Sequence, residues 1–214
     1  MREAAAQHVV YVHGLWMPGG ESLLLAQRLL REFGLQMHAF PYSAATWDME
    51  EITAHLQSFV HSLGLAAVHF VGHSLGGLVI YRFFERYPEQ PPGRVVFLGT
   101  PCLESRAAVQ AAQSRFVSAL MGPSVAEELL RPRERRWSFG RPLGIVAGTQ
   151  SVGLGQFIVG FEEESDGTVA VSETRMPGAA DHITLPVSHM GLLVSARVAR
   201  ETGFFLMNGR FSLR

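Results

Sequence analysis

The sequence predicts an α/β fold, in which a mostly parallel β-sheet has helices packed on both of its faces. Short runs rich in β-branched and aromatic residues alternate with longer runs in which apolar residues recur at helical spacing. A strand, a helix and a second strand in that order form a right-handed crossover, and repeated crossovers build a parallel sheet covered on both sides. The predicted strands are residues 8–13, 36–42, 68–72, 94–99, 143–147 and 183–187.

The helices between these strands are predicted from apolar stripes and from residues that start or stop a helix. The first begins near Leu23 and ends at Gly34, because glycine readily adopts the left-handed conformation that ends a helix. The second follows Asp48 and Glu51, which have the spacing of a capping box, and ends at Gly64. The third helix directly follows the third strand.

Residues 104–131 interrupt this alternation. They contain two helical runs, 104–121 and 125–130, and no strand-like run. The insertion follows the carboxyl end of a strand, which is the edge where parallel sheets bind ligands, so one interpretation is a lid or pocket wall. The other is a long crossover between the fourth and fifth strands. Residues 150–165 fit neither pattern.

Composition limits the class of protein. With 214 residues, of which 47% are hydrophobic, the chain can build one sizeable core, and we expect a single domain over residues 1–214. A formal charge of −1 argues against nucleic acid or anionic membrane as the main partner, since both require a concentrated basic face. The single cysteine, Cys102, and the lack of a secretory signal pattern favour a cytoplasmic location. No apolar run approaches the ~20 residues that span a bilayer, so we expect no stable membrane insertion.

A serine flanked by glycines follows the third predicted strand. Residues 72–76 read Gly-His-Ser-Leu-Gly, the pattern G-x-S-x-G. We expect Gly72 and Gly76 to lie where strand and helix backbones approach too closely for a Cβ. A sharp strand-to-helix turn would project the Ser74 hydroxyl above the sheet edge, beside the free N–H groups of the helix. Ser74 is therefore the candidate nucleophile, and the alternative is an ordinary glycine-rich loop before a helix.

A serine hydroxyl needs a base to accept its proton and an acid to orient that base. His189 lies between the sixth predicted strand and the C-terminal helix, and Asp166 opens an Asp-Gly-Thr-Val turn. Acid and histidine thus follow Ser74 in the order typical of such sites, so we predict His189 as the base and Asp166 as its partner. Asp181 and residues 162–164 are rival acids. The sequence has no His-Glu-x-x-His motif and no cysteine pair, so we expect no metal and no other cofactor.

The oxyanion of a tetrahedral intermediate needs two backbone donors. We expect one from the N–H of Leu75, which follows the nucleophile, and the other from Leu15 in the glycine loop after the first strand. Trp16 and Met17 come next, and their soft apolar side chains suit an acyl chain, so both are predicted to bind substrate. The alternative for this loop is a plain glycine turn.

These segments together resemble the lipase and esterase branch of the α/β-hydrolase superfamily, specifically its small bacterial lipase-like members. The resemblance covers nearly the whole chain and rests on residues 13–15, 72–77, 166–169 and 188–189. It implies an α/β-hydrolase fold and hydrolysis of small- or medium-chain carboxylic esters through an acyl-enzyme on Ser74, with a small-molecule ester as the partner. A thioesterase or an amidase would use the same residues, whereas a binding module on this scaffold would have no need of all three.

Overall fold

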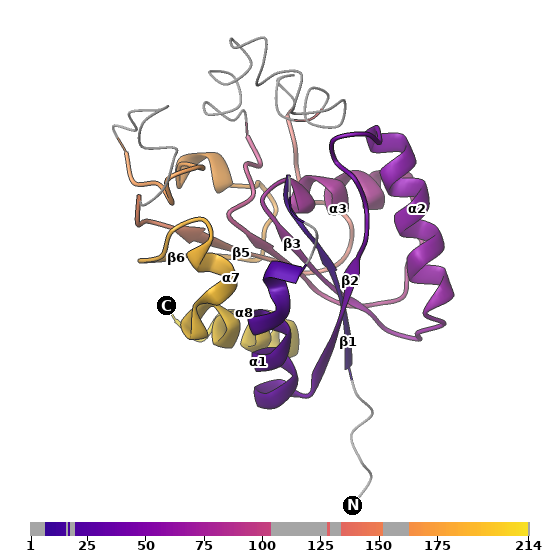
Figure 1. The fold of residues 1–214 in the computed structure, drawn as a ribbon, viewed down its shortest axis with the longest axis horizontal. Coiled ribbons are helices and arrows are strands. Elements are labelled where there is room, and N and C mark those ends of the chain that lie inside the picture. Colours follow the sequence, from indigo (N-terminus) through magenta and orange to yellow (C-terminus); the bar gives the residue numbers. More distant parts are fainter. Residues whose placement is uncertain are drawn as a thin grey trace, which may run out of the picture.

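The protein is described by a computed structural model that covers residues 7–15, 17, 20–103, 128, 134–151 and 163–213. Its centre is a six-stranded sheet in the order β2-β1-β3-β4-β5-β6, in which every neighbouring pair is parallel (Figure 1). The strands are β1 (Gln7–Val12), β2 (Leu35–Phe40), β3 (His69–His73), β4 (Val95–Leu98), β5 (Leu143–Gly148) and β6 (Asp181–Leu185). The α/β prediction is confirmed, and each strand begins and ends within two residues of its predicted bounds.

Helices cover both faces of this sheet. One face is covered by α2 (Met49–Ser62) and α3 (Leu75–Arg86). The other is covered by α1 (Leu23–Phe33), α7 (Gly191–Val194) and α8 (Ala196–Asn208), which lie together in Figure 1. Two short 3-10 helices complete the described elements, namely η1 (Gly20–Ser22) and η2 (Ser172–Thr174).

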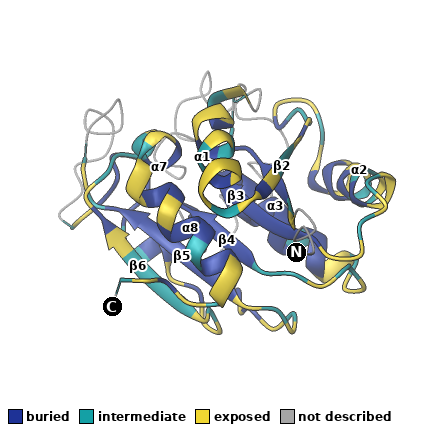
Figure 2. Ribbon diagram, turned by 90° about the horizontal axis from the view of Figure 1, so that it is seen from below, coloured by how far each residue is buried: buried dark blue, intermediate teal, exposed yellow. Residues whose placement is uncertain are grey.

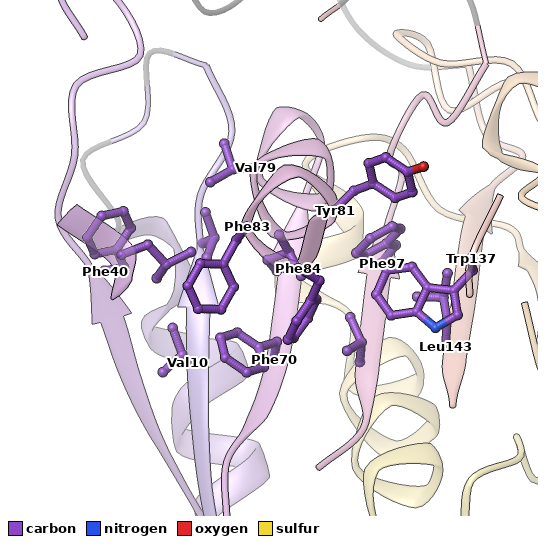
Figure 3. Close-up of a cluster of buried hydrophobic side chains, with 14 of the residues drawn as sticks. Val10, Phe40, Phe70, Val79, Tyr81, Phe83, Phe84, Phe97, Trp137 and Leu143 are labelled. Carbon is purple, nitrogen blue, oxygen red and sulfur yellow. The ribbon is translucent and has the colours of Figure 1, made fainter. Parts of the chain in front are cut away.

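Alternate residues of each strand enter two separate cores, because successive side chains of a strand point to opposite faces. In β1, Val10 and Val12 face the α2 and α3 side, whereas Val9 and Tyr11 face the α1 and α8 side. The first core is rich in aromatic rings (Figure 3), and burying each contributes roughly 1.5–3 kcal/mol. Its labelled residues are Val10, Phe40, Phe70, Val79, Tyr81, Phe83, Phe84, Phe97, Trp137 and Leu143. The result is a rigid sheet whose carboxyl edge can hold side chains in place.

The predicted helix signals are confirmed. The Asp48 carboxylate accepts the Glu51 N–H at 2.8 Å, and the Glu51 carboxylate accepts the Asp48 N–H at 3.0 Å, which is a complete capping box at the start of α2. Gly34 ends α1 in the left-handed conformation, with φ of +67°. Within the described ranges, no helix combines the length and apolar character needed to cross a membrane.

The predicted lid, residues 104–131, lies outside the described residues except for Glu128. The Glu128 side chain is buried and pairs with Arg135 at 2.8 Å and with Arg82 of α3 at 3.0 Å. Of residues 150–165, the ends are described, and Ser151 Oγ lies 2.7 Å from Ser165 Oγ. The two ends of that segment therefore lie side by side next to the carboxyl edge of β5.

Candidate active site

Ser74 sits on a strained turn between β3 and α3. Its φ of 54° and ψ of −125° make it the one non-glycine residue in the described part of the chain with a positive φ. Such a conformation costs roughly 1–3 kcal/mol, so the surrounding structure must enforce it. Ser74 N–H donates to the carbonyl of Leu98 at 2.9 Å, and the Ser74 carbonyl accepts the N–H of Gly77 at 3.1 Å. The turn is thus held from both sides.

The glycines around Ser74 are required by close backbone contacts, as the sequence predicts. A Cβ on Gly72 would lie 2.6 Å from the Cα of Gly77, and a Cβ on Gly76 would lie 2.0 Å from the carbonyl oxygen of Val12. Real Cβ atoms do not approach backbone so closely, so any larger residue would force strand and helix apart. The G-x-S-x-G segment is therefore a tight strand-to-helix turn and not an ordinary loop.

Asp166 and His189 form a directly bonded pair. His189 Nδ1 lies 2.7 Å from Asp166 Oδ2. The other carboxylate oxygen accepts the N–H groups of Thr168 at 2.9 Å and Val169 at 2.7 Å. Asp166 is only 1% exposed, and its carbonyl also accepts the N–H of His189 at 2.8 Å. Because both carboxylate oxygens are occupied, the acid cannot rotate away from the imidazole.

This pair lies at the same sheet edge as Ser74. The nucleophile candidate follows β3, whereas Asp166 and His189 precede and follow β6. The His189 ring packs against the ring of His73, with centroids 4.6 Å apart, and His73 directly precedes Ser74. In the described part of the chain, Ser74 Oγ makes no hydrogen bond to His189, a contact that often tightens only when substrate binds. The three predicted residues are thus brought to one place, with the imidazole beside the serine turn.

Gly99 makes room for the pair at the end of β4. It has a φ of +56°, and a Cβ there would lie 2.9 Å from Asp166 Oδ2 and 3.2 Å from His189 Nδ1. Any side chain at this position would press on the bonded pair.

The predicted oxyanion donors border the same turn. Leu75 is the first residue of α3, so its N–H has no partner within the helix. The loop that carries Leu15 passes over the serine, since a Cβ on Gly14 would lie 3.0 Å from Ser74 Cβ. Met17 packs, partly buried, against the core on the α1 and α8 side. Trp16 lies outside the described residues.

Comparisons with known proteins place the chain in a family. The sequence profile of the alpha/beta hydrolase family matches residues 9–202. The chain belongs to the alpha/beta hydrolase family. A search of the curated proteins gives no match.

The fold of this hydrolase is similar to several solved structures. The lipase BlEst2 of Bacillus licheniformis in its mature form is 19% identical with a TM-score of 0.73, covering 96% of this chain and 93% of the lipase. The metagenomic carboxyl esterase MGS0156 is 17% identical with a TM-score of 0.67, covering 92% and 73%. The RedJ thioesterase of Streptomyces coelicolor is 14% identical with a TM-score of 0.61, covering 94% and 86%. At these identities the likeness establishes the fold alone.

Two buried histidines border the site of this hydrolase without having been predicted as site residues. His73 Nε2 lies 3.2 Å from the carbonyl oxygen of His189, and His13 Nδ1 lies 2.8 Å from the carbonyl oxygen of Gly14. Since a carbonyl only accepts, each of these nitrogens carries the proton. The His13 ring also stacks on Tyr42, with centroids 4.2 Å apart. Burial lowers the pKa of both histidines, that of His73 strongly, so both stay neutral beside the base.

The rival acid Asp181 is engaged elsewhere. It begins β6, where its two carboxylate oxygens accept the N–H groups of His182 and Phe211, each at 2.9 Å. These contacts tie the C-terminal segment to the amino ends of the strands, whereas Ser74 lies at their carboxyl ends. Within the described residues, no group of three or more His, Cys, Asp or Glu side chains gathers as metal ligands would.

Proposed function

We propose that this protein is a serine hydrolase that cleaves carboxylic esters of small or medium acyl chains through an acyl-enzyme intermediate. Ser74 is the nucleophile, His189 the general base and Asp166 the residue that orients it. The observation that carries the proposal is the buried 2.7 Å contact between Asp166 and His189 beside a strained serine turn. The folds of a lipase and a carboxyl esterase lend further support.

The proposed reaction begins when Ser74 Oγ attacks the ester carbonyl carbon and its proton passes to His189 Nε2. Asp166 keeps the Nδ1 proton in place and stabilises the imidazolium that forms. The carbonyl oxygen becomes an oxyanion, which the N–H groups of Leu75 and Leu15 stabilise. When the intermediate collapses, the C–O bond to the alcohol breaks and His189 returns its proton to the leaving oxygen. Water then attacks the acyl-enzyme by the same route, and the acid and free Ser74 are released.

The position of Ser74 at the start of α3 favours this chemistry. The N-terminus of a helix carries roughly half a positive charge, which stabilises an oxyanion formed beside it. The neutral state of His73 also favours this chemistry, because a charged neighbour would oppose protonation of His189. Both effects favour the transition state over the bound ester.

A thioesterase is the second candidate, because the fold is also similar to that of the RedJ thioesterase. The same three residues would act, but a thiolate leaves with less help from His189 because it is a weaker base than an alkoxide. Amide hydrolysis lies at the other extreme and depends most on protonation of the leaving nitrogen. The ratio of ester to thioester turnover therefore distinguishes the two candidates.

The proposal is tested with a panel of chromogenic esters, thioesters and amides of increasing acyl length. We expect the highest kcat/KM on dissolved short- or medium-chain esters. Ser74→Ala should lose more than about a thousandfold in kcat, because only the oxyanion donors and substrate binding would remain. Ser58→Ala, at an exposed serine of α2, is the matched control and should keep full activity. No turnover by the wild-type protein on any substrate would favour a binding module instead.

A further inference from the structure

Large exposed apolar side chains gather on one side of the molecule. Six of the seven in the described residues lie on α1, α7, α8 or the residue before α7, and the most exposed is Leu23 at 72%. The six are Leu23, Leu24, Leu30, Met190, Val194 and Met207. The three helices contact one another, and Figure 2 shows them side by side with exposed residues along their outer sides. We call this surface the α1–α8 face.

The same face is basic. Its helices carry four arginines against two glutamates, and Glu201 is buried, where it accepts hydrogen bonds from Ser212. Glu32 is the remaining carboxylate, and it lies 3.9 Å from Arg31. The exposed charge of the face is therefore positive. The exposed arginines are Arg31, Arg197 and Arg200, whereas Arg28 is half-buried and donates to the carbonyl oxygen of Val194.

The opposite helical layer has the reverse character. The α2 and α3 helices, with the cap residue of α2, carry four carboxylates and two arginines. Arg86 pairs with Glu50 at 2.5 Å, and Arg82 pairs with Glu85 at the same distance. Among the described residues, no large apolar side chain of α2 or α3 is exposed. The two helical layers thus carry opposite charge, which the formal charge of −1 for the whole chain does not reveal.

We propose that the α1–α8 face docks reversibly on an anionic lipid surface. Exposed leucines enter the boundary between head groups and acyl chains, while neighbouring arginines contact anionic head groups. Neither the exposed apolar side chains nor the arginines would bind a membrane strongly alone, but both on one face favour peripheral binding. A symmetric contact between two copies of this chain would bring the same basic face against itself, which like charges oppose. The anionic lipid surface satisfies both the charge and the apolar side chains.

The face is continuous with the candidate active site. The loop from β6 passes through His189 to the exposed Met190 and directly into α7. The loop after β1, which carries Leu15, leads through η1 into the start of α1 and the exposed Leu23. Both loops of the site thus run into the proposed docking surface, so a docked molecule would hold its site close to the lipid boundary. The docking itself does not depend on catalysis.

The test is co-sedimentation with vesicles of phosphatidylcholine alone and of phosphatidylcholine with phosphatidylglycerol. The Ser74→Ala protein is used throughout, so that lipid hydrolysis and the fate of the proposed function do not affect the result. We expect binding only to the anionic vesicles, and weaker binding as salt is raised. Arg200→Glu changes the charge of the face by two units and should weaken binding about 25-fold, at about fivefold per charge.

Two variants complete the design. Arg136→Glu makes the same charge change at an exposed residue away from the face, and it should bind as the parent does. Leu23→Ser should weaken binding without changing its salt dependence. Equal binding to both vesicle types, or equal losses in Arg200→Glu and Arg136→Glu, would overturn the proposal. A dimer that Leu23→Ser dissociates would also overturn it, because a second copy of the chain would then cover the face. Binding to polyglutamate that is as tight as binding to the vesicles and insensitive to Leu23→Ser would overturn it too, since it would indicate an acidic protein as the partner.

Discussion

Gly99→Ala tests whether the bonded Asp166–His189 pair controls activity. An alanine Cβ there would lie 2.9 Å from Asp166 Oδ2 and 2.6 Å from a methyl group of Leu192, whereas ordinary contact begins near 3.4 Å. The carboxylate must therefore shift by about 0.5 Å and the methyl group by about 0.8 Å. Asp166 cannot yield freely, because its other oxygen accepts two backbone N–H groups. The imidazole of His189 moves with it.

We expect kcat/KM of Gly99→Ala to fall by roughly 10- to 100-fold, since a 1 Å misplacement can cost about a hundredfold. The positive φ of +56° also costs alanine about 1–2 kcal/mol of stability. Gly64→Ala is the matched control, because Gly64 has a φ of +60° and nothing within 4 Å of its Cβ position. It should lose only the stability that the positive φ costs, and no activity.

The assay is initial-rate kinetics on a dissolved chromogenic ester, below the melting temperatures of both variants, with thermal unfolding measured in parallel. If Gly99→Ala stayed within twofold of Gly64→Ala in kcat/KM, the geometry of the pair would not control the reaction. That result would refute the reasoning even if the pair exists.

Three further predictions follow from the contacts around the site. Asp166→Asn keeps the shape of the acid but turns an NH2 group toward His189, so kcat should fall by about 10⁴-fold. Asp181→Asn should reduce stability alone. The opposite ranking of the two variants in kinetic and melting measurements would make Asp181 the acid. His73→Phe keeps the ring packing but removes the hydrogen bond to the His189 carbonyl in the loop after β6, so kcat should fall several-fold at constant KM. An unchanged kcat would contradict this positioning role. Burial lowers the pKa of His13 and His73, and it lowers the pKa of His69 to about 4. Below about pH 6.5, the unfolded protein therefore takes up protons on these histidines that the folded protein resists taking up. Stability is therefore full above that pH and should fall below it by up to about 1.4 kcal/mol per pH unit for each histidine, which urea unfolding at pH 7 and pH 5 would measure; equal stabilities would contradict it.

The strands and helices are predicted well from the sequence, because the residues that determine each of them are neighbours in the chain. The strands are β-branched runs of about the right length, and the cap at Asp48 depends on residues three apart. The motif around Ser74 also predicts its strained turn, since the close contact of Gly72 with Gly77 is set by a strand and helix that adjoin in the chain. The close contact of Gly76 is different, because it is made with the backbone of Val12 in β1. The chain order of acid and histidine then locates Asp166.

Long-range features could not be predicted in the same way. Gly99 looks like any glycine at the end of a strand, and its importance comes from two residues that the fold brings to it from far along the chain. His73 precedes the serine, but the contact of its ring with His189 depends on where the loop after β6 lies, and β4 and β5 separate β6 from β3 in the sheet. The formal charge of −1 likewise conceals a basic and an acidic face, because a sum over the chain carries no information about direction.

Covalent labelling with a fluorophosphonate is the most direct measurement of the central claim, that Ser74 is activated by His189 and Asp166. The probe forms a bond to an activated serine oxygen and loses fluoride, so intact-mass analysis counts the modified sites and peptide mapping locates them. We predict a single adduct on Ser74, absent in Ser74→Ala and much slower to form in Asp166→Asn. An unlabelled wild-type protein, or an adduct on another serine that persists in Ser74→Ala, would contradict the account.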